Sequence, residues 1–102
     1  MIKRTVLYGR PDDTAAFDAH YFNVHVPLAQ RVPHVAKLEV SRVADVAGTS
    51  TPPYYMVAVL YYDDEAALAE ASASPEGAAV AADVPTFAPG GVTVIRSELV
   101  DP

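Results

Sequence analysis

Residues 54–62 read YYMVAVLYY, a run of aromatic and aliphatic side chains with Pro52-Pro53 before it and Asp63-Asp64 after it. Aromatic and β-branched residues favour an extended strand. Alternate residues of a strand point to opposite faces of the sheet, and both alternating sets of this run are apolar. We therefore predict a strand that is covered on both of its faces.

The segments on either side of this strand have their own periodicity. Before it we predict a strand over residues 2–8, a helical segment from Thr14 and a half-exposed strand over residues 35–43. Pro27 interrupts the helical spacing, so we expect two short helical pieces that meet near residues 24–26. After it, Asp63 or Asp64 starts one helix, Ser74 caps another, and residues 92–100 alternate as a last strand.

The predicted order is strand, helix, strand, strand, helix, strand. This order predicts a single domain over residues 1–102 of the α+β class, a ferredoxin-like sandwich with a four-stranded antiparallel sheet and helices on one face. The helices cover only one face, so the apolar opposite face of residues 54–62 needs another cover. We expect a second copy of the chain there, in a symmetric homodimer that packs sheet against sheet.

Composition narrows the function further. The chain has 102 residues, no cysteine, 13 acidic against 7 basic side chains and a net charge of -6. The absence of cysteine excludes disulfides, thiolate metal sites and a cysteine nucleophile. The acidic balance disfavours nucleic acid and anionic membranes as partners, and no apolar run reaches the about 20 residues of a spanning helix. We expect a cytoplasmic protein.

The three histidines are the first candidates for chemistry. Five residues along an α-helix correspond to about 140°, so His20 and His25 are expected on different faces, with His20 toward solvent. His34 lies in a turn after Pro33. His25 lies at the helical break before Pro27, where it either performs acid–base chemistry or only stabilises the break. Their spacing matches no common metal-binding motif, so we predict no metal site.

Asp83 is the most informative acid. It lies within residues 78–84, a helical stretch that is otherwise apolar. A carboxylate there must be exposed or paired, because burying an unpaired charge is costly.

Residues 17–33, FDAHYFNVHVPLAQRVP, resemble the hallmark segment of the EthD family, which reads Phe, an aromatic pair, His, then Pro-Leu-Ala and a later Pro. The resemblance extends to Ser74-Pro75-Glu76 at a helix start and to residues 83–87, DVPTF, and it covers nearly the whole chain. One departure is His34, at a position where the family usually has glycine. The shape of that turn is therefore left open.

The resemblance implies a dimeric α+β barrel, with His25 at the family's histidine position and Asp83 as its polar companion. Family members are generally assigned as oxidoreductases of degradative pathways. We therefore expect a small oxidoreductase that acts on a small apolar or aromatic compound and needs no cofactor. His25 would abstract or donate a proton, and Asp83 would orient its imidazole or hold a substrate hydroxyl. The expected apolar wall of the substrate pocket consists of Tyr21, Phe22, Tyr55 and Phe87.

Three alternatives stay open from the sequence. The wider superfamily includes cofactor-free isomerases and cyclases, and other members bind haem, for which His25 would be an axial ligand. The third alternative is a non-catalytic dimeric binding or accessory module, in which His25 only stabilises the broken helix.

Overall fold

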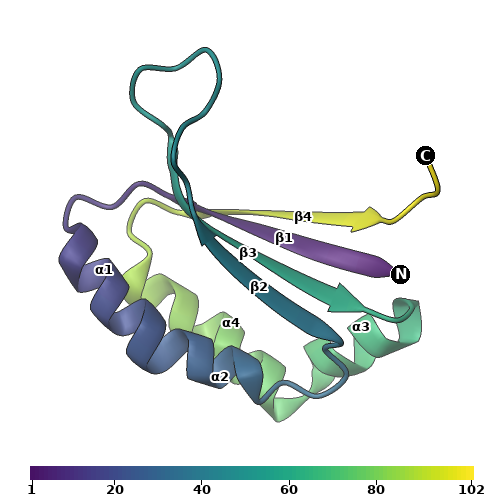
Figure 1. The fold of residues 1–102 in the computed structure, drawn as a ribbon. Coiled ribbons are helices and arrows are strands. Elements are labelled where there is room, and N and C mark those ends of the chain that lie inside the picture. The colour runs from purple at the N-terminus through teal and green to yellow at the C-terminus, as the bar shows by residue number, and fades with distance from the viewer.

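The computed structural model describes residues 1–102 and contains one four-stranded sheet. Its strands lie in the order β2 (Lys37–Arg42), β3 (Tyr54–Tyr62), β1 (Ile2–Gly9) and β4 (Val92–Glu98), and each neighbouring pair is antiparallel. All the helices lie on one side of this sheet, as Figure 1 shows. The predicted ferredoxin-like α+β architecture is confirmed.

The helical layer begins where the sequence signals place it. The first segment runs through α1 (Thr14–His20), η1 (Tyr21–His25) and α2 (Val26–Gln30), and the second through α3 (Glu65–Ala73) and α4 (Pro75–Phe87). The side chains of Asp13, Asp64 and Ser74 each accept a hydrogen bond from a backbone N–H in the first turn of α1, α3 and α4. Such caps stabilise a helix by about 1 kcal/mol each. Of the two predicted starts of α3, Asp63 and Asp64, the structure has Asp64, and the predicted cap Ser74 of α4 is confirmed.

Strand register decides which side chains meet the helices. Tyr8 of β1 pairs with Met56 of β3 and Val92 of β4, so even-numbered residues of these strands share the helical side. The main core gathers there and is rich in aromatic rings; its buried members are Tyr8, Phe17, Tyr21, Tyr55, Met56, Ala58 and Phe87. Edge-to-face ring pairs such as Tyr8 and Phe17, with centroids 5.7 Å apart, add about 0.5–1.5 kcal/mol each to simple burial.

A β-bulge changes the orientation of one strand residue. Tyr8 pairs with Met56 but Gly9 pairs with Tyr54, so Tyr55 is the extra residue of β3. Tyr55 consequently packs on the helical side, where its ring lies 5.3 Å from that of Phe17 and its hydroxyl donates to Asp18 Oδ1 at 2.9 Å.

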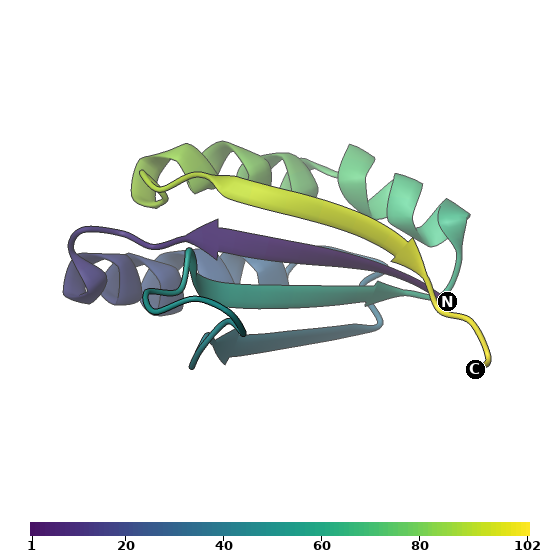
Figure 2. The same ribbon diagram turned by 90° about the horizontal axis from the view of Figure 1, so that it is seen from above.

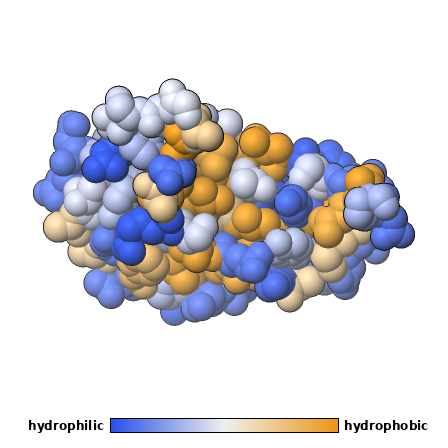
Figure 3. Space-filling model, turned by 45° about the horizontal axis from the view of Figure 1, so that its top comes forward, coloured by the Kyte–Doolittle hydropathy of each residue, from blue (hydrophilic) through white to orange (hydrophobic).

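The opposite face of the sheet is apolar at its centre and only partly covered. Odd-numbered residues of the strands point there, and the aliphatic ones are Leu7, Val57, Val59 and Ile95. Ile95 keeps 46% of its surface exposed. Figure 2 looks onto this face, and Figure 3 shows hydrophobic side chains gathered across its middle with hydrophilic ones around them. Within one chain, then, only one face of β3 is fully covered.

Two local details differ from or extend the sequence prediction. β2 begins at Lys37 rather than residue 35 and follows a turn in which His34 has φ 67°, the left-handed conformation that favours glycine. The histidine therefore keeps the backbone shape of a glycine turn. None of the helices combines the length and the apolar character that crossing a bilayer requires.

Candidate functional site

A π-helical turn brings the two histidines of the first helical segment together. Residues Tyr21–His25 form η1, and the N–H of Val26 donates to the carbonyl of Tyr21, five residues earlier. A π-turn contains more residues than the 3.6 of an α-turn, so residues five apart come close to one face. The prediction that His20 and His25 diverge, with His20 toward solvent, is therefore wrong. Pro27 follows directly, at the start of α2.

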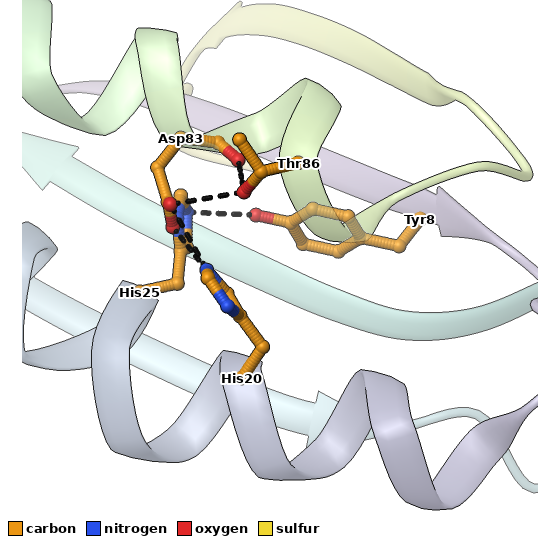
Figure 4. A network of polar contacts seen from close by, with 5 residues as sticks. All are labelled: Tyr8, His20, His25, Asp83 and Thr86. Carbon is orange, nitrogen blue, oxygen red and sulfur yellow. Dashed lines mark hydrogen bonds and ion pairs between the residues drawn. The ribbon is translucent and has the colours of Figure 1, made fainter.

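Both histidines contact the same carboxylate, that of Asp83 on α4. His20 Nε2 lies 2.9 Å from both Asp83 oxygens, and His25 Nδ1 lies 2.9 Å from Oδ2. Figure 4 shows Asp83 between the two rings. The Thr86 hydroxyl, one turn further along α4, also lies 3.1 Å from Oδ1. Asp83 is thus paired rather than exposed, and the expected contact between Asp83 and His25 is present.

The hydrogen bonds define the protonation pattern of His25. A carboxylate only accepts hydrogen bonds, so Nδ1 of His25 carries the proton that faces Asp83. In the neutral ring Nε2 is then an acceptor, and the Tyr8 hydroxyl lies 3.3 Å from it. The result is a continuous chain, seen in Figure 4, from Tyr8 through His25 and Asp83 to His20.

Burial sets the charge states along this chain. Burial lowers the pKa of His25, and the hydrogen bond and charge of Asp83 offset this only in part, so the imidazole is neutral near pH 7. Burial by itself would raise the pKa of Asp83, but hydrogen bonds from His20, His25 and Thr86 outweigh it and hold the carboxyl below its ordinary pKa. Burial also raises the pKa of Tyr8 far above its ordinary value, so this hydroxyl stays protonated. A neutral imidazole therefore lies between a hydrogen-bond donor and an anion.

A cavity of about 430 Å³ lies between the sheet and the helices and reaches this chain. Tyr8, Tyr21 and His25 line one end, and most of the other lining side chains are apolar. Val92 and Val94 of the edge strand β4 also line it, yet expose 40% and 54% of their surface. The cavity therefore opens beside β4, and its size suits a small organic molecule.

Only one of the four expected wall residues lines this cavity. Tyr21 does so, and burial raises its pKa to about 12. Phe22 lies on the outer side of η1 with 44% of its surface exposed. Tyr55 is turned toward α1 by the bulge, and Phe87 lies behind the histidines, its ring centroid 4.6 Å from that of His25. Phe22, Tyr55 and Phe87 thus lie outside the cavity, and Phe87 supports the imidazoles from behind.

The sequence reasoning missed Tyr8, His20 and Thr86 as members of the site. Tyr8 and the buried Ile2 are both even-numbered residues of one strand, so their side chains point to the same, helical side of the sheet. This alternation does not show that Tyr8, rather than one of the five other tyrosines, belongs to the site. His20 was assigned by α-helical geometry, which a π-turn invalidates. Thr86 lies three residues after Asp83, and this spacing on a helix was an available signal.

The side chains of the site do not suit a metal centre. Both ring nitrogens of His25 are engaged, Nδ1 by Asp83 and Nε2 by the Tyr8 hydroxyl, so any ligand of Nε2, a haem iron included, would have to displace the Tyr8 contact. No group of three or more His, Cys, Asp or Glu side chains has a geometry that could hold a metal ion.

The comparisons with known proteins agree with this fold. The family model described as the EthD domain matches residues 11–91, which include His20, His25 and Asp83. The chain belongs to the EthD family. It is 34% identical to an ethyl tert-butyl ether d (EthD) family protein of Bacillus halodurans, whose crystal structure superposes with a TM-score of 0.90 and covers 98% of this chain and 99% of that one. The resemblance seen in residues 17–33 is confirmed.

Two further proteins to which this EthD chain is similar have no assigned activity. An uncharacterized 11.0 kDa protein from the thcB-thcC intergenic region of Rhodococcus erythropolis is 43% identical over 98 residues, 96% of this chain and 94% of that protein. A dimeric ferredoxin-like protein of unknown function from Thermobifida fusca is 15% identical, with a TM-score of 0.72 over 96% of this chain and 90% of that one. At that identity the likeness concerns the fold alone.

Proposed function

We propose that this EthD-family chain is a single-domain enzyme that works as a homodimer and transfers protons on a small, mostly apolar molecule in the cavity. The observation that carries the proposal is the hydrogen-bonded chain of side chains Tyr8–His25–Asp83–His20. It holds the buried neutral imidazole of His25 at one end of an apolar cavity. Strongly perturbed titratable groups that converge on a cavity are typical of catalytic sites.

His25 would act as the base. Its Nδ1–H is held by Asp83, which leaves the Nε2 lone pair directed to the cavity end where Tyr8 lies. Nε2 would take a proton from an acidic C–H or O–H of the substrate, and the Asp83 carboxylate would stabilise the imidazolium that forms. The imidazolium would then return a proton to the substrate, either the one it took or one exchanged with solvent, so the step needs no reactant other than water.

Tyr8 would supply the complementary hydrogen bond. Because its pKa is far above the ordinary value, its hydroxyl keeps its proton and can donate a hydrogen bond. A hydroxyl rotates freely about its C–O bond, so the O–H that faces His25 Nε2 in this structure would turn to a substrate oxygen on binding. A carbonyl held in this way acidifies the neighbouring C–H, which is the proton that His25 would remove.

His20 would connect the site to water. Its side chain is 31% exposed and lines a second hollow, of about 480 Å³, between α1 and the C-terminal end of α4. His20 and His25 share the carboxylate of Asp83, which would stabilise a positive charge on His25. The extra proton of His25 would exchange with solvent through Asp83 and His20.

The oxidoreductase activity expected from the family rests on the resemblance and not on this geometry. Removal of a substrate proton by His25 would begin either a cofactor-free oxidation by molecular oxygen or an isomerisation or cyclisation. The proton transfer is common to both, so we propose it as the basic activity. The cytoplasmic location stays a prediction from composition.

The homodimer is supported by the open sheet face. The aliphatic side chains of that face, centred on Val57 and Val59, are only half-buried within the chain. A second copy packed sheet to sheet would bury them, which a solvated apolar patch of this kind favours.

Deuterium exchange tests the activity without a known substrate. Acetophenone, cyclohexanone and octanone would be incubated in deuterated buffer, with deuterium incorporation beside the carbonyl measured by mass spectrometry. We expect the protein to accelerate exchange on at least one of them, and His25→Gln to lower that rate by roughly a hundredfold or more. His34→Gln is the matched control and keeps the full rate. An equal rate in His25→Gln and the unchanged protein would contradict the proposal.

Oxygen consumption separates the two kinds of reaction. Uptake of oxygen that tracks the exchange rate across variants would support the oxidoreductase. Exchange without oxygen uptake would support the isomerase or cyclase.

A further inference from the structure

Three arginines of the sheet point to its helical side, and one of them lacks an acidic partner. Arg42 of β2 pairs with Asp18 of α1 at 3.1 Å, and Arg96 of β4 pairs with Glu65 of α3. Arg4 of β1 has no carboxylate within ion-pair distance; its Nη2 donates to the Ser72 hydroxyl at 3.2 Å. A guanidinium carries five N–H donors, so one hydrogen bond to a neutral oxygen leaves most of them free.

This arginine lines the cavity at the end away from His25. Arg4, Val6 and Tyr8 follow one another on the same side of β1, and all three line the cavity. The Cα atoms of Arg4 and Tyr8 are about 13 Å apart at the usual rise of a strand. Above them, α4 runs from Gly77 to Val84 along the cavity, about 10 Å at the helical rise. The cavity is therefore elongated, with a cation at one end and the imidazole at the other.

The walls between these two ends are apolar. They are formed by Val6, Ala58 and Leu60 of the sheet and by Val26, Val80 and Val84 of the helices. A smaller adjoining hollow of about 180 Å³ is lined by Arg4, Ser72 and Gly77. Free space thus exists beside the guanidinium as well as beside the imidazole.

We propose that the cavity binds amphipathic carboxylic acids, with the carboxylate on Arg4 and the reacting part of the molecule at Tyr8 and His25. This inference rests on the proposed function, since it names the substrate class of the same cavity. The guanidinium of Arg4 is half-buried and lies over the Tyr62 ring, 5.9 Å from its centroid. The chain supplies acidic partners to Arg42 and Arg96 but not to Arg4, so a bound anion would offset the cost of burying this cation. A carboxylate fits a guanidinium through two parallel N–H···O bonds.

The overall charge of the chain makes this feature selective. At a net charge of -6 the protein as a whole repels anions, so an anionic ligand needs a local cation. The apolar walls extend for roughly 10 Å between Arg4 and His25. A small polar acid would not fill this space and would leave the walls in contact with water, so the cavity selects against such acids. The substrate class is then an apolar or aromatic acid with a reactive oxygen-bearing group at the end opposite its carboxylate.

Matched acid and alcohol pairs test the inference. Cinnamate with cinnamyl alcohol, and octanoate with octanol, would be titrated into the full chain, with dissociation constants from calorimetry and contact with the cavity from shifts of the His25 ring signals in NMR. We expect at least one acid to bind about tenfold or more tighter than its alcohol. Arg4→Gln should remove this preference and leave alcohol binding unchanged.

Two further variants keep the result interpretable. Arg96→Gln makes the same charge change on the neighbouring strand outside the cavity, and we expect it to retain the preference for the acid. Arg4→Lys should retain part of it, because a lysine keeps the charge but not the paired geometry.

The outcomes separate this inference from the proposed function. An alcohol that binds as tightly as its acid and shifts the His25 signals would overturn the role of Arg4 and leave the cavity as a binding site. An equal loss of acid preference in Arg4→Gln and Arg96→Gln would also overturn it, since it would show a general charge effect. If no probe of either pair binds the unchanged protein, both proposals are contradicted.

Discussion

The two faces of the sheet differ in how completely their side chains are buried and hydrogen-bonded. On the helical face, aromatic rings and three histidine or carboxylate side chains are packed together, and every buried side-chain nitrogen or oxygen has a hydrogen-bond partner. On the outer face, aliphatic side chains stay partly exposed. One chain thus contains all the side chains of the proposed proton transfer, while its outer sheet face is the surface that the proposed second copy would cover.

The largest expected effect concerns the outer face. Val59→Asp puts a charge at the centre of that face, and in a symmetric dimer it would introduce two buried like charges. We expect the dimer to dissociate to monomers at micromolar concentration, measured by light scattering, while the histidine site stays folded. Ala69→Asp, at an exposed position of α3 in the helical layer, is the control and should remain dimeric. A monomeric mass for the unchanged protein would refute the assignment of this face.

The next effect concerns the helical face. Asp83→Asn replaces the anion between the two histidines by an amide, so the charge-assisted hydrogen bonds to His20 and His25 become neutral ones. We expect the free energy of unfolding to fall by about 1–3 kcal/mol, measured by urea denaturation. The variant Glu70→Gln, on the surface of α3, should change it little. An unchanged stability in Asp83→Asn would mean that the carboxylate is not the centre of the network.

Acid should weaken the helical face selectively. The pKa of His25 is lower in the folded chain than the ordinary 6.5, so below about pH 6.5 the unfolded chain binds the proton more readily and stability falls with decreasing pH. The pKa of Asp83 is also lowered, so its contribution is present above its ordinary value and is lost as pH falls through the folded value. Melting temperatures recorded across this range in His25→Gln should lack the decline that begins near pH 6.5. An identical decline in this variant would assign it to another group.

Much of the fold could be predicted because local signals and global pattern agree. The order of elements, residues 54–62 as a strand, and the caps at Asp64 and Ser74 follow from alternation and capping chemistry. The sequence predicts that β2 begins at residue 35, two residues before the observed Lys37, because nothing in the sequence signals the left-handed turn at His34.

The site could be predicted only in part. His25 and Asp83 were found, by a break at Pro27 and by a charge in an apolar helix, and the structure brings them to 2.9 Å. The sequence predicts the wrong surroundings for His20 because a π-turn shifts the helical periodicity by one residue. A β-bulge brings Tyr55 to the helical side, but there it packs toward Asp18 of α1 and not into the cavity. The places of such irregular turns and bulges depend on tertiary packing. The spacing of apolar residues in the sequence does not contain this information.

The smallest effect concerns the turn before β2, outside both faces. His34 is a non-glycine residue at φ 67°, a conformation that costs roughly 1 kcal/mol with a side chain present. Its exposed contact with Glu70 at 3.1 Å offsets little of this cost. His34→Gly should therefore raise the free energy of unfolding by up to about 1 kcal/mol in chemical denaturation. A clear loss of stability would show that the imidazole contributes more than the backbone strain removes.

The protonation state of His25 is the centre of the account, and heteronuclear NMR of the imidazole nitrogens measures it directly. We predict a neutral ring near pH 7 with the proton on Nδ1, toward Asp83, and a pKa below the ordinary value of about 6.5. A ring that is charged at that pH, or a neutral ring with its proton on Nε2, would contradict the proposed base and the cavity chemistry built on it.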